Sequence, residues 1–308
     1  MKRPRRSQRG YVLVLTLAVL VLAATALASA GRLAVRHAAR ARDAERDLRR
    51  RVGVASCRAA VLPRAEQILV AQEVRRGAPV AQRRAAVRLG EFTFDLVIAD
   101  EHAKASVNAI LATAPRDVVE TRLRRTLAGS GLPGAVVLRP VTSSTDERTS
   151  HITGFGQMFD EVEPQALLSS RGGVPAPTDL LTCWGGGAIN VRRASEAALR
   201  LALSPPWTSA DVARLLEARR AMFEAKTSDS SNLRPSPARP APGAARRRDP
   251  LARLLQDAQI RTGGAGLTLE SACHSLWIVT RDGRRQWYDL AVADAPKDQP
   301  RRVITFTW

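Results

Sequence analysis

Residues 11–30, YVLVLTLAVLVLAATALASA, form an uncharged apolar run that directly follows the basic decapeptide MKRPRRSQRG. As an α-helix rising about 1.5 Å per residue, a run of this length spans about 30 Å, the thickness of the hydrocarbon core of a bilayer. No second run of this kind occurs in the 308 residues. The sequence therefore predicts a single membrane-spanning helix near the N-terminus.

The leader that precedes the run is basic, with Lys2, Arg3, Arg5, Arg6 and Arg9. Basic residues beside a membrane helix are retained on the cytoplasmic side. We therefore expect a single-pass protein with a cytoplasmic N-terminus. Everything after residue 30 is then expected on the other side of the membrane.

Three interpretations of this region are open. Ala28-Ser29-Ala30 fits the A-x-A pattern of signal peptidase, which would make the chain a Sec-exported periplasmic protein. In the second interpretation the run is an uncleaved anchor. In the third, the chain is cut after Gly10, so that the mature protein begins at Tyr11 and keeps the apolar helix.

A stripe of small and apolar residues continues the run at steps of three, four and seven: Ala34, Ala38, Ala41, Leu48, Val52, Ala55, Ala59 and Leu62. This spacing predicts a continuous helix from Tyr11 to about Leu62, ending before Pro63. Gly31 and Gly53 are weak points in it. The stripe favours the third interpretation, although an ordinary anchor followed by a linker helix gives the same pattern.

Composition narrows the class of protein. With 45% hydrophobic and 25% charged residues, the chain is typical of folded proteins. The net charge of +19 would suit nucleic acid or an acidic membrane surface, but arginine in an alanine-rich chain also rises with genomic base composition. Three separated cysteines indicate neither a disulfide framework nor a zinc site, and at most Cys183 and Cys273 could form a bridge.

Strand patterns lie on both sides of a central region. Apolar residues alternate from Val87 to Ile98, which predicts a half-buried strand. Near the C-terminus, residues 276–279 and 287–292 flank Asp282-Gly283, a strong hairpin signal, and residues 303–308 supply a third strand.

The central region is expected to be helical. Residues 115–128 form one predicted helix, and a short helical pattern lies near 164–169. Ser195 is a candidate N-cap for a helix to about Leu203. Thr208 and Asp211 form a capping box for a helix to about Ala225. Residues 226–250 are rich in proline, alanine and arginine and are predicted to be a disordered linker.

The last two helices are similar to a helix-hairpin-helix unit. Such units elsewhere bind nucleic-acid phosphates through backbone N–H groups, and nearby arginines could assist: Arg192, Arg193, Arg200 and Arg214. We prefer a protein-docking role for the unit and do not expect nucleic acid to be the partner.

The leader resembles the type III signal of type IV pilins and type II secretion pseudopilins, in which a prepilin peptidase cuts after a glycine such as Gly10, before Tyr11. Most of these proteins carry glutamate at the fifth mature position, where this chain has Leu15. The minor pseudopilin K family of type II secretion (general secretion pathway protein K) typically lacks that glutamate. It also has the largest periplasmic domain of the set. The resemblance therefore implies a single-pass protein of a bacterial inner membrane, with a cytoplasmic N-terminus and a periplasmic C-terminal domain.

Two further segments resemble the same family. In DEHAKASVNAIL, an acidic turn after a strand matches at Asp100, Glu101, Lys104 and Asn108, with Ser106 in place of an asparagine. In TCWGGGAINVRRA, the glycine-rich turn matches at Trp184, Gly185, Gly187 and Asn190, whereas Arg192 and Arg193 replace the usual Asn-Thr.

The resemblance implies an α+β fold with a long N-terminal transmembrane and stem helix, a pilin-like antiparallel sheet and an inserted helical domain of helix-hairpin-helix or SAM-like type. The expected boundaries are a leader at 1–10, a membrane helix at 11–30, a stem at 31–62, a first sheet segment at 63–100, an insertion at 101–225, a linker at 226–250 and a second sheet segment at 251–308.

The resemblance also implies the function: a minor pseudopilin at the tip of a periplasmic pseudopilus that supports protein secretion. Its partners would be other minor pseudopilins, the major pseudopilin, the prepilin peptidase and the inner membrane. Calcium is known in the family, but no Asp-rich loop assigns its ligands here. The alternatives are a nucleic-acid-binding or DNA-uptake pilin-like protein and a Sec-exported protein.

Catalytic patterns are weak. Asp100, Glu101 and His102 are consecutive, and adjacent strand residues point to opposite faces, so we expect a polar loop there and no active site. The histidines lack metal spacing such as HExxH, and the glycines at 185–187 lack the GK[ST] of a phosphate loop. We therefore expect a protein that is not an enzyme.

Overall fold

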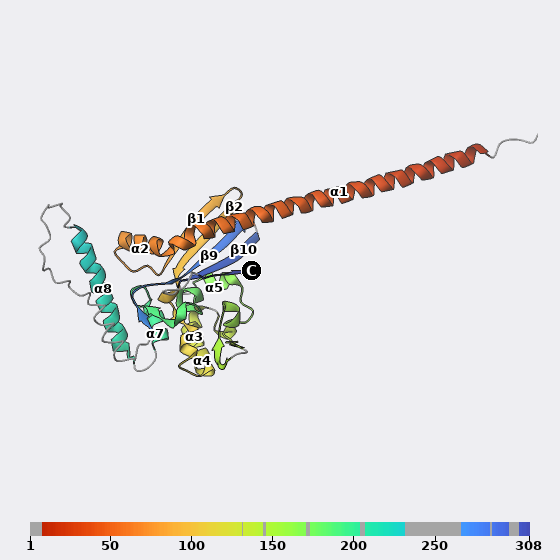
Figure 1. Cartoon of the computed structure of the whole chain (residues 1–308). Coiled ribbons are helices and arrows are strands. Elements are labelled where there is room, and N and C mark those ends of the chain that lie inside the picture. The colour runs from red at the N-terminus through yellow and green to blue at the C-terminus, as the bar shows by residue number, and fades with distance from the viewer. Residues whose placement is uncertain are drawn as a thin grey trace, which may run out of the picture. The chain divides into compact units, whose positions relative to one another are not determined.

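The computed structural model describes residues 8–130, 132–143, 146–170, 173–203, 207–231, 266–283, 285–295 and 302–308. The fold is α+β, with a long N-terminal helix, an antiparallel sheet and several shorter helices (Figure 1). The chain divides into two compact units, residues 1–55 and 56–308.

Helix α1, Gln8–Val61, makes up the described part of the first unit and enters the second. The large apolar side chains of residues 11–27 are exposed, from 52% for Leu15 to 73% for Leu27. An 18-residue window of mean hydropathy 2.6 makes this helix long and apolar enough to cross a membrane. The helix passes through Gly31 without a break and ends before Pro63, as the sequence predicts.

A second helix, α2, follows a single 3-10 turn, Leu62–Arg64. It spans Ala65–Arg76 and ends at Gly77, whose φ of 61° is left-handed and whose N–H donates to the Glu73 carbonyl at 2.9 Å. The sequence analysis missed α2, because it assigned residues 63–100 to the sheet. The omission matters, since α2 carries two carboxylates of the site described below.

The sheet has five strands in the order β1-β2-β9-β10-β11, with every neighbouring pair antiparallel. Their bounds are β1 Gln82–Leu89, β2 Phe92–Asp100, β9 Cys273–Asp282, β10 Arg285–Asp294 and β11 Arg302–Thr307. The predicted hairpin at Asp282-Gly283 and the third C-terminal strand are therefore confirmed.

The interpretation of residues 87–98 as one strand was wrong. They form a β1–β2 hairpin that turns at Gly90, where φ is 62° and favours glycine. The apolar residues keep their alternating pattern across the turn, because Val87 of β1 is paired with Phe94 of β2. Phe94 is fully buried, whereas Val87 lies on an edge strand and is 36% exposed.

Between β2 and β9, residues 101–272 interrupt the sheet with an insertion of short elements (Figure 1). Its helices are α3 Val107–Leu111, α4 Arg116–Thr126, α5 Pro164–Leu168, α6 Pro177–Leu180, α7 Glu196–Ala202 and α8 Ser209–Ser231. Its short strands are β3 Ala105–Ser106, β4 Val141–Ser143, β5 Asp146–His151, β6 Leu181–Thr182, β7 Ile189–Asn190 and β8 Leu267–Thr268.

The insertion extends beyond the predicted end at residue 225, because β8 pairs in parallel with β7. Residues 226–231, assigned to the linker, are the last turns of α8. The rest of the predicted linker lies outside the described residues.

The predicted caps of the insertion's helices are present. Ser195 Oγ accepts a hydrogen bond from the Ala198 N–H at 3.1 Å and starts α7. At the start of α8, the Thr208 N–H donates to Asp211 Oδ2 at 2.9 Å, and the Asp211 N–H donates to Thr208 Oγ1 at 3.2 Å. This reciprocal pair is the expected capping box.

One core joins the sheet to the insertion. Val97, Trp277 and Leu290 from the sheet belong to the same buried cluster as Leu123 and Phe155 from the insertion. The inserted residues therefore share the hydrophobic interior of the sheet instead of forming a separate appendage.

Candidate functional site

The acidic turn at the end of β2 is buried. The predicted polar loop is a buried turn, in which Asp100 and Glu101 are 0% exposed and His102 is 9% exposed. Asp100 caps a 3-10 turn, Glu101–Ala103, by accepting a hydrogen bond from the Ala103 N–H at 3.2 Å. This turn lets successive polar side chains point inward together, which a continuing strand would prevent.

Asp100 links the two segments that carry the family resemblance. The Asn190 side-chain amide donates to Asp100 Oδ2 at 2.9 Å, although the two residues are 90 positions apart. The Ser271 hydroxyl donates to the other carboxylate oxygen of Asp100. A buried carboxylate needs such partners to offset its lost hydration.

Glu101 is paired with Lys104, which reaches it from one turn further on, and both side chains are buried. The Ser275 hydroxyl of β9 donates to the same carboxylate oxygen, Oε1. Among the described residues, Glu101 Oε2 has no hydrogen-bond partner. The hydrogen bond from Ser275 therefore joins the turn to β9, the central strand of the sheet.

The glycine-rich turn lies against this acidic turn. His102 Nε2 lies 2.7 Å from the Gly185 carbonyl oxygen. Gly185 has φ of 81°, and a Cβ there would lie 2.6 Å from His102 Cδ2. Gly187 has φ of 84° and would place a Cβ 3.0 Å from Ala109 Cβ. Backbone conformation and close contact therefore both require glycine at these two positions.

Asn108 completes the connection. Its side-chain amide donates to the Ile152 carbonyl at 2.8 Å and to the Cys183 carbonyl at 2.9 Å, and its Oδ1 accepts from the Ile152 N–H at 2.8 Å. Three backbone groups from two distant segments are thus held by one side chain. We call Asp100, Glu101, Asn108, Gly185 and Asn190, with their partners, the polar junction.

Arg193, one of the two departures from the family pattern, lies in the middle of the junction. Its side chain is 1% exposed and donates to Glu73 Oε1 at 2.8 Å, to Glu66 Oε1 at 2.9 Å and to Asp100 Oδ2 at 3.2 Å. Burial would lower the pKa of Arg193, but the hydrogen bonds to Glu66 and Glu73 and the charge of Asp100 raise it above its usual value.

Glu66 of α2 accepts hydrogen bonds from Arg193, and its Oε2 also lies 3.0 Å from His274 Nε2. Partial burial would raise the pKa of Glu66, but hydrogen bonds from His274 and Arg193 outweigh burial and lower the pKa to about 2. Glu66 therefore stays ionised at every physiological pH.

The sequence analysis missed Glu66 and Glu73. A signal was present, because Ala65, Leu69 and Glu73 recur every four residues and all three are buried on one face of α2. A carboxylate on an apolar helix face requires a buried partner, and Arg193 supplies it.

The arginines proposed to assist phosphate binding are all paired within the protein. Arg192 binds Glu73, Arg193 binds the three carboxylates above, Arg200 binds Glu196, and Arg214 binds Asp211. Intramolecular carboxylates therefore hold Arg193 in a buried network and partly neutralise the other three arginines, which weakens their attraction for a nucleic-acid phosphate.

All three cysteines are free and buried: Cys57, Cys183 and Cys273. Burial raises the pKa of the Cys183 and Cys273 thiols, and the charge of Glu101 raises it further. A thiol with a raised pKa is a weak nucleophile, because the thiolate is the reactive form.

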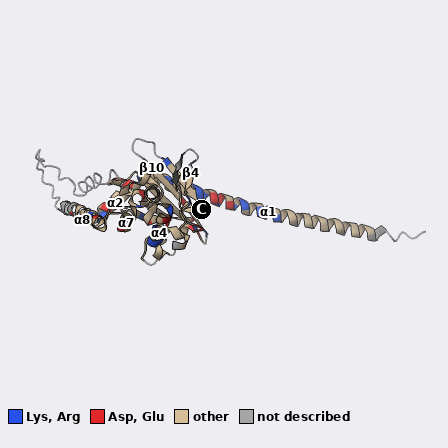
Figure 2. Ribbon diagram, turned by 90° about the horizontal axis from the view of Figure 1, so that it is seen from below, with Lys and Arg blue, Asp and Glu red and all other residues tan. Residues whose placement is uncertain are grey.

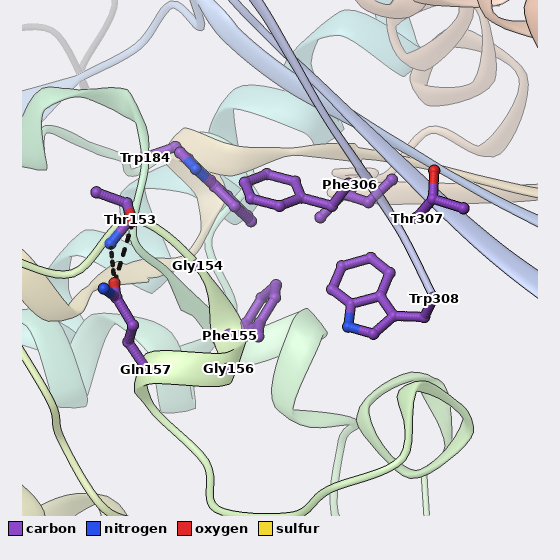
Figure 3. A pocket seen from close by; sticks show the side chains of 10 residues that line it. Thr153, Gly154, Phe155, Gly156, Gln157, Trp184, Phe306, Thr307 and Trp308 are labelled. Atoms are coloured by element: carbon purple, nitrogen blue, oxygen red, sulfur yellow. Dashed lines mark hydrogen bonds between the residues drawn. The ribbon is translucent and has the colours of Figure 1, made fainter.

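An aromatic hollow of about 360 Å³ lies beside the junction, with Phe155, Trp184, Phe306 and Trp308 on its walls (Figure 3). The rings of Phe155 and Trp184 meet edge to face with centroids 5.4 Å apart, and those of Phe306 and Trp308 stack at 5.9 Å. Thr153 and Gln157 form the polar rim of the hollow, where Gln157 Oε1 accepts a hydrogen bond from the Thr153 N–H at 2.6 Å.

The hollow was not predicted, because its lining residues come from four separate segments: 153–157, Trp184, Leu290 and 306–308. Trp184 was singled out only as part of the glycine turn. Its ring forms the contact between that turn and Phe306 of β11, at a centroid distance of 5.9 Å.

No group of three or more His, Cys, Asp or Glu side chains suited to a metal ion occurs among the described residues. The structure therefore assigns no ligands to the calcium that the family resemblance implies. Gly10 and Tyr11, the expected cleavage position, both lie within α1, and the Tyr11 side chain is 71% exposed.

No protein-family model matches the sequence, and a search of curated proteins finds no match. Among solved structures, the chain is similar to a chain of the GspK-GspI-GspJ complex from the enterotoxigenic Escherichia coli type 2 secretion system, at 14% sequence identity and a TM-score of 0.39. The similarity covers 87% of this chain and 99% of that chain. At this level it assigns neither a family nor a function.

Proposed function

We propose that the protein is a minor pseudopilin that acts at the tip of a type II secretion pseudopilus and is not an enzyme. The observation that carries the proposal is the interruption of the antiparallel sheet between β2 and β9 by residues 101–272, in a chain that begins with a long apolar helix. A large insertion on a pilin-like scaffold is what the resemblance to the K family implies.

The polar junction supports the same proposal. The two segments that resemble the family motifs meet through Asp100 and Asn190, 2.9 Å apart, and through His102 and Gly185, 2.7 Å apart. The motif residues therefore have a structural task, which is to hold the insertion against the sheet. Catalysis is not needed to account for them.

In this proposal a prepilin peptidase removes the leader after Gly10, and the apolar part of α1 holds the protein in the inner membrane until assembly. The same helix then packs against the helices of other minor pseudopilins and the major pseudopilin. Leu15 replaces the glutamate that, in the family, neutralises the N-terminal amine of a neighbouring subunit, and a tip subunit has no neighbour above it. The insertion would block further subunits from stacking on the tip.

Among the described residues, the four candidate arginines are paired with carboxylates, which does not favour the nucleic-acid alternative. Complementation separates the two functions. Deleting the gene should abolish type II secretion and leave DNA uptake unchanged, and the full-length gene should restore secretion. Unchanged secretion, or loss of DNA uptake alone, would contradict the proposal.

A further inference from the structure

Three arginines follow the apolar run on one face of α1. Arg32, Arg36 and Arg40 are spaced four residues apart, so their side chains lie one above another along the helix. All three are exposed. From residue 11 to residue 42 the chain contains no acidic residue, and the first acidic residue, Asp43, follows Arg40 by three positions. We call these three residues the arginine row.

The arginine row differs from several arginines farther along α1. Further along α1, Arg49 pairs with Glu45 at 2.6 Å and Arg51 pairs with Asp47 at 2.6 Å. The arginine row has no ion pair or side-chain hydrogen bond within the described part of the chain. Figure 2 shows the helix uncharged along the apolar run and charged positions on its C-terminal side.

The arginine row begins in the headgroup layer of a bilayer and extends beyond it. At 1.5 Å per residue, Arg32, Arg36 and Arg40 lie about 3, 9 and 15 Å beyond Ala30. The headgroup layer adds about 5 to 7 Å to each side of the hydrocarbon core, so the Cα of Arg32 lies within the layer, that of Arg36 just outside it and that of Arg40 farther out. Helical side chains lean toward the N-terminus, which here is toward the membrane, and long arginine side chains extend along that direction.

We propose that the arginine row binds the phosphates of anionic phospholipids, such as phosphatidylglycerol, at the end of the membrane-spanning part of α1. Guanidinium groups form paired hydrogen bonds with phosphate oxygens. The inference rests on the membrane-spanning part of the proposed function and not on the tip role. It holds whichever end of α1 is cytoplasmic, because both leaflets present headgroups.

The row would have a consequence for assembly. A helix that leaves the membrane for a filament must first release these lipids, so anionic lipid raises the barrier to extraction. The row thus fixes the height of the precursor in the membrane and holds it there until assembly begins.

The test uses the full chain in phosphatidylcholine vesicles that contain a trace of spin-labelled phosphatidylglycerol or spin-labelled phosphatidylcholine. The fraction of each label that is motionally restricted by the protein measures lipid selectivity. Because the leader is basic as well, every variant is made on a background with a neutral leader: K2Q, R3Q, R5Q, R6Q and R9Q.

On this background we expect the protein to prefer phosphatidylglycerol severalfold, since one arginine near an anionic surface contributes about a fivefold preference. The triple variant R32Q/R36Q/R40Q should reduce the preference to near parity, and so should 0.5 M salt. The matched triple R46Q/R49Q/R51Q, which removes the same charge at about 24 to 32 Å beyond Ala30, should leave it unchanged.

Two results would overturn the inference in different ways. Equal restriction of both lipids by the parent chain, or equal losses from the two triple variants, would remove the headgroup site and leave the tip role intact. The absence of any restricted lipid would show that α1 does not span the bilayer, and the proposed function would then fail as well.

Discussion

Arg193 Nε lies 2.8 Å from Glu73 Oε1, and both side chains are 1% exposed. The pair joins the segment after the glycine turn to helix α2, which precedes the sheet. Because Glu66 and Asp100 also bind Arg193, one cation holds three elements of the domain together.

Replacing Arg193 should strongly destabilise the domain. Arg193→Ala leaves the Glu73 and Asp100 carboxylates buried without their partner, and breaking such a pair costs about 3 to 5 kcal/mol of unfolding free energy. Urea denaturation of residues 56–308 measures the loss. The control is Arg200→Ala, which removes an exposed pair with Glu196 and should cost less than about 1 kcal/mol. Similar losses for the two variants would show that the buried network contributes little.

Stability should fall in acid through Glu66. Its pKa is lowered from an ordinary value of 4.5 to about 2 in the folded protein, so its contribution is complete above pH 4.5 and is lost as the pH falls toward 2. Glu66→Gln should therefore show a shallower decline of unfolding free energy between those pH values. Parallel pH profiles for the two proteins would contradict the assigned contacts with His274 and Arg193.

Gly185→Ala should destabilise the glycine turn. The alanine would have to adopt φ of 81° with its Cβ 2.6 Å from His102, and strain of this kind costs about 1 to 3 kcal/mol. Gly134→Ala is the control, because a Cβ there meets no atom within 4 Å. Thermal unfolding compares the two variants, and equal melting temperatures would refute the close contact.

The domain should not bind duplex DNA tightly. Because carboxylates already pair with Arg192, Arg193, Arg200 and Arg214, we expect no submicromolar affinity at physiological salt. Fluorescence anisotropy with a labelled duplex measures the affinity of residues 56–308. Submicromolar binding that weakens steeply with salt would favour the DNA-uptake alternative.

Local signals predicted much of this fold. The unbroken apolar and alanine-rich pattern predicted α1, the Thr208–Asp211 box predicted the start of α8, and Asp282-Gly283 predicted the β9–β10 hairpin. Each of these depends on residues close together in sequence, which is why spacing alone is informative.

The site depends on distant residues and was predicted only in part. The motif positions were identified, but the burial of Asp100 depends on Asn190 and Ser271, which lie 90 and 171 positions away. The aromatic hollow combines Phe155, Trp184 and Trp308 in the same way. No periodicity within one segment could bring these side chains together, because tertiary contacts decide where they lie.

The central claim is that the apolar part of α1 is retained after the leader is removed. Intact mass and N-terminal sequencing of the protein recovered from membranes test it most directly. We expect a mature N-terminus at Tyr11, and Gly10→Val should block this cleavage because the bulkier residue would not fit the peptidase. A protein that begins at Gly31 would instead have lost the apolar helix to signal peptidase, and the pseudopilin proposal would be contradicted.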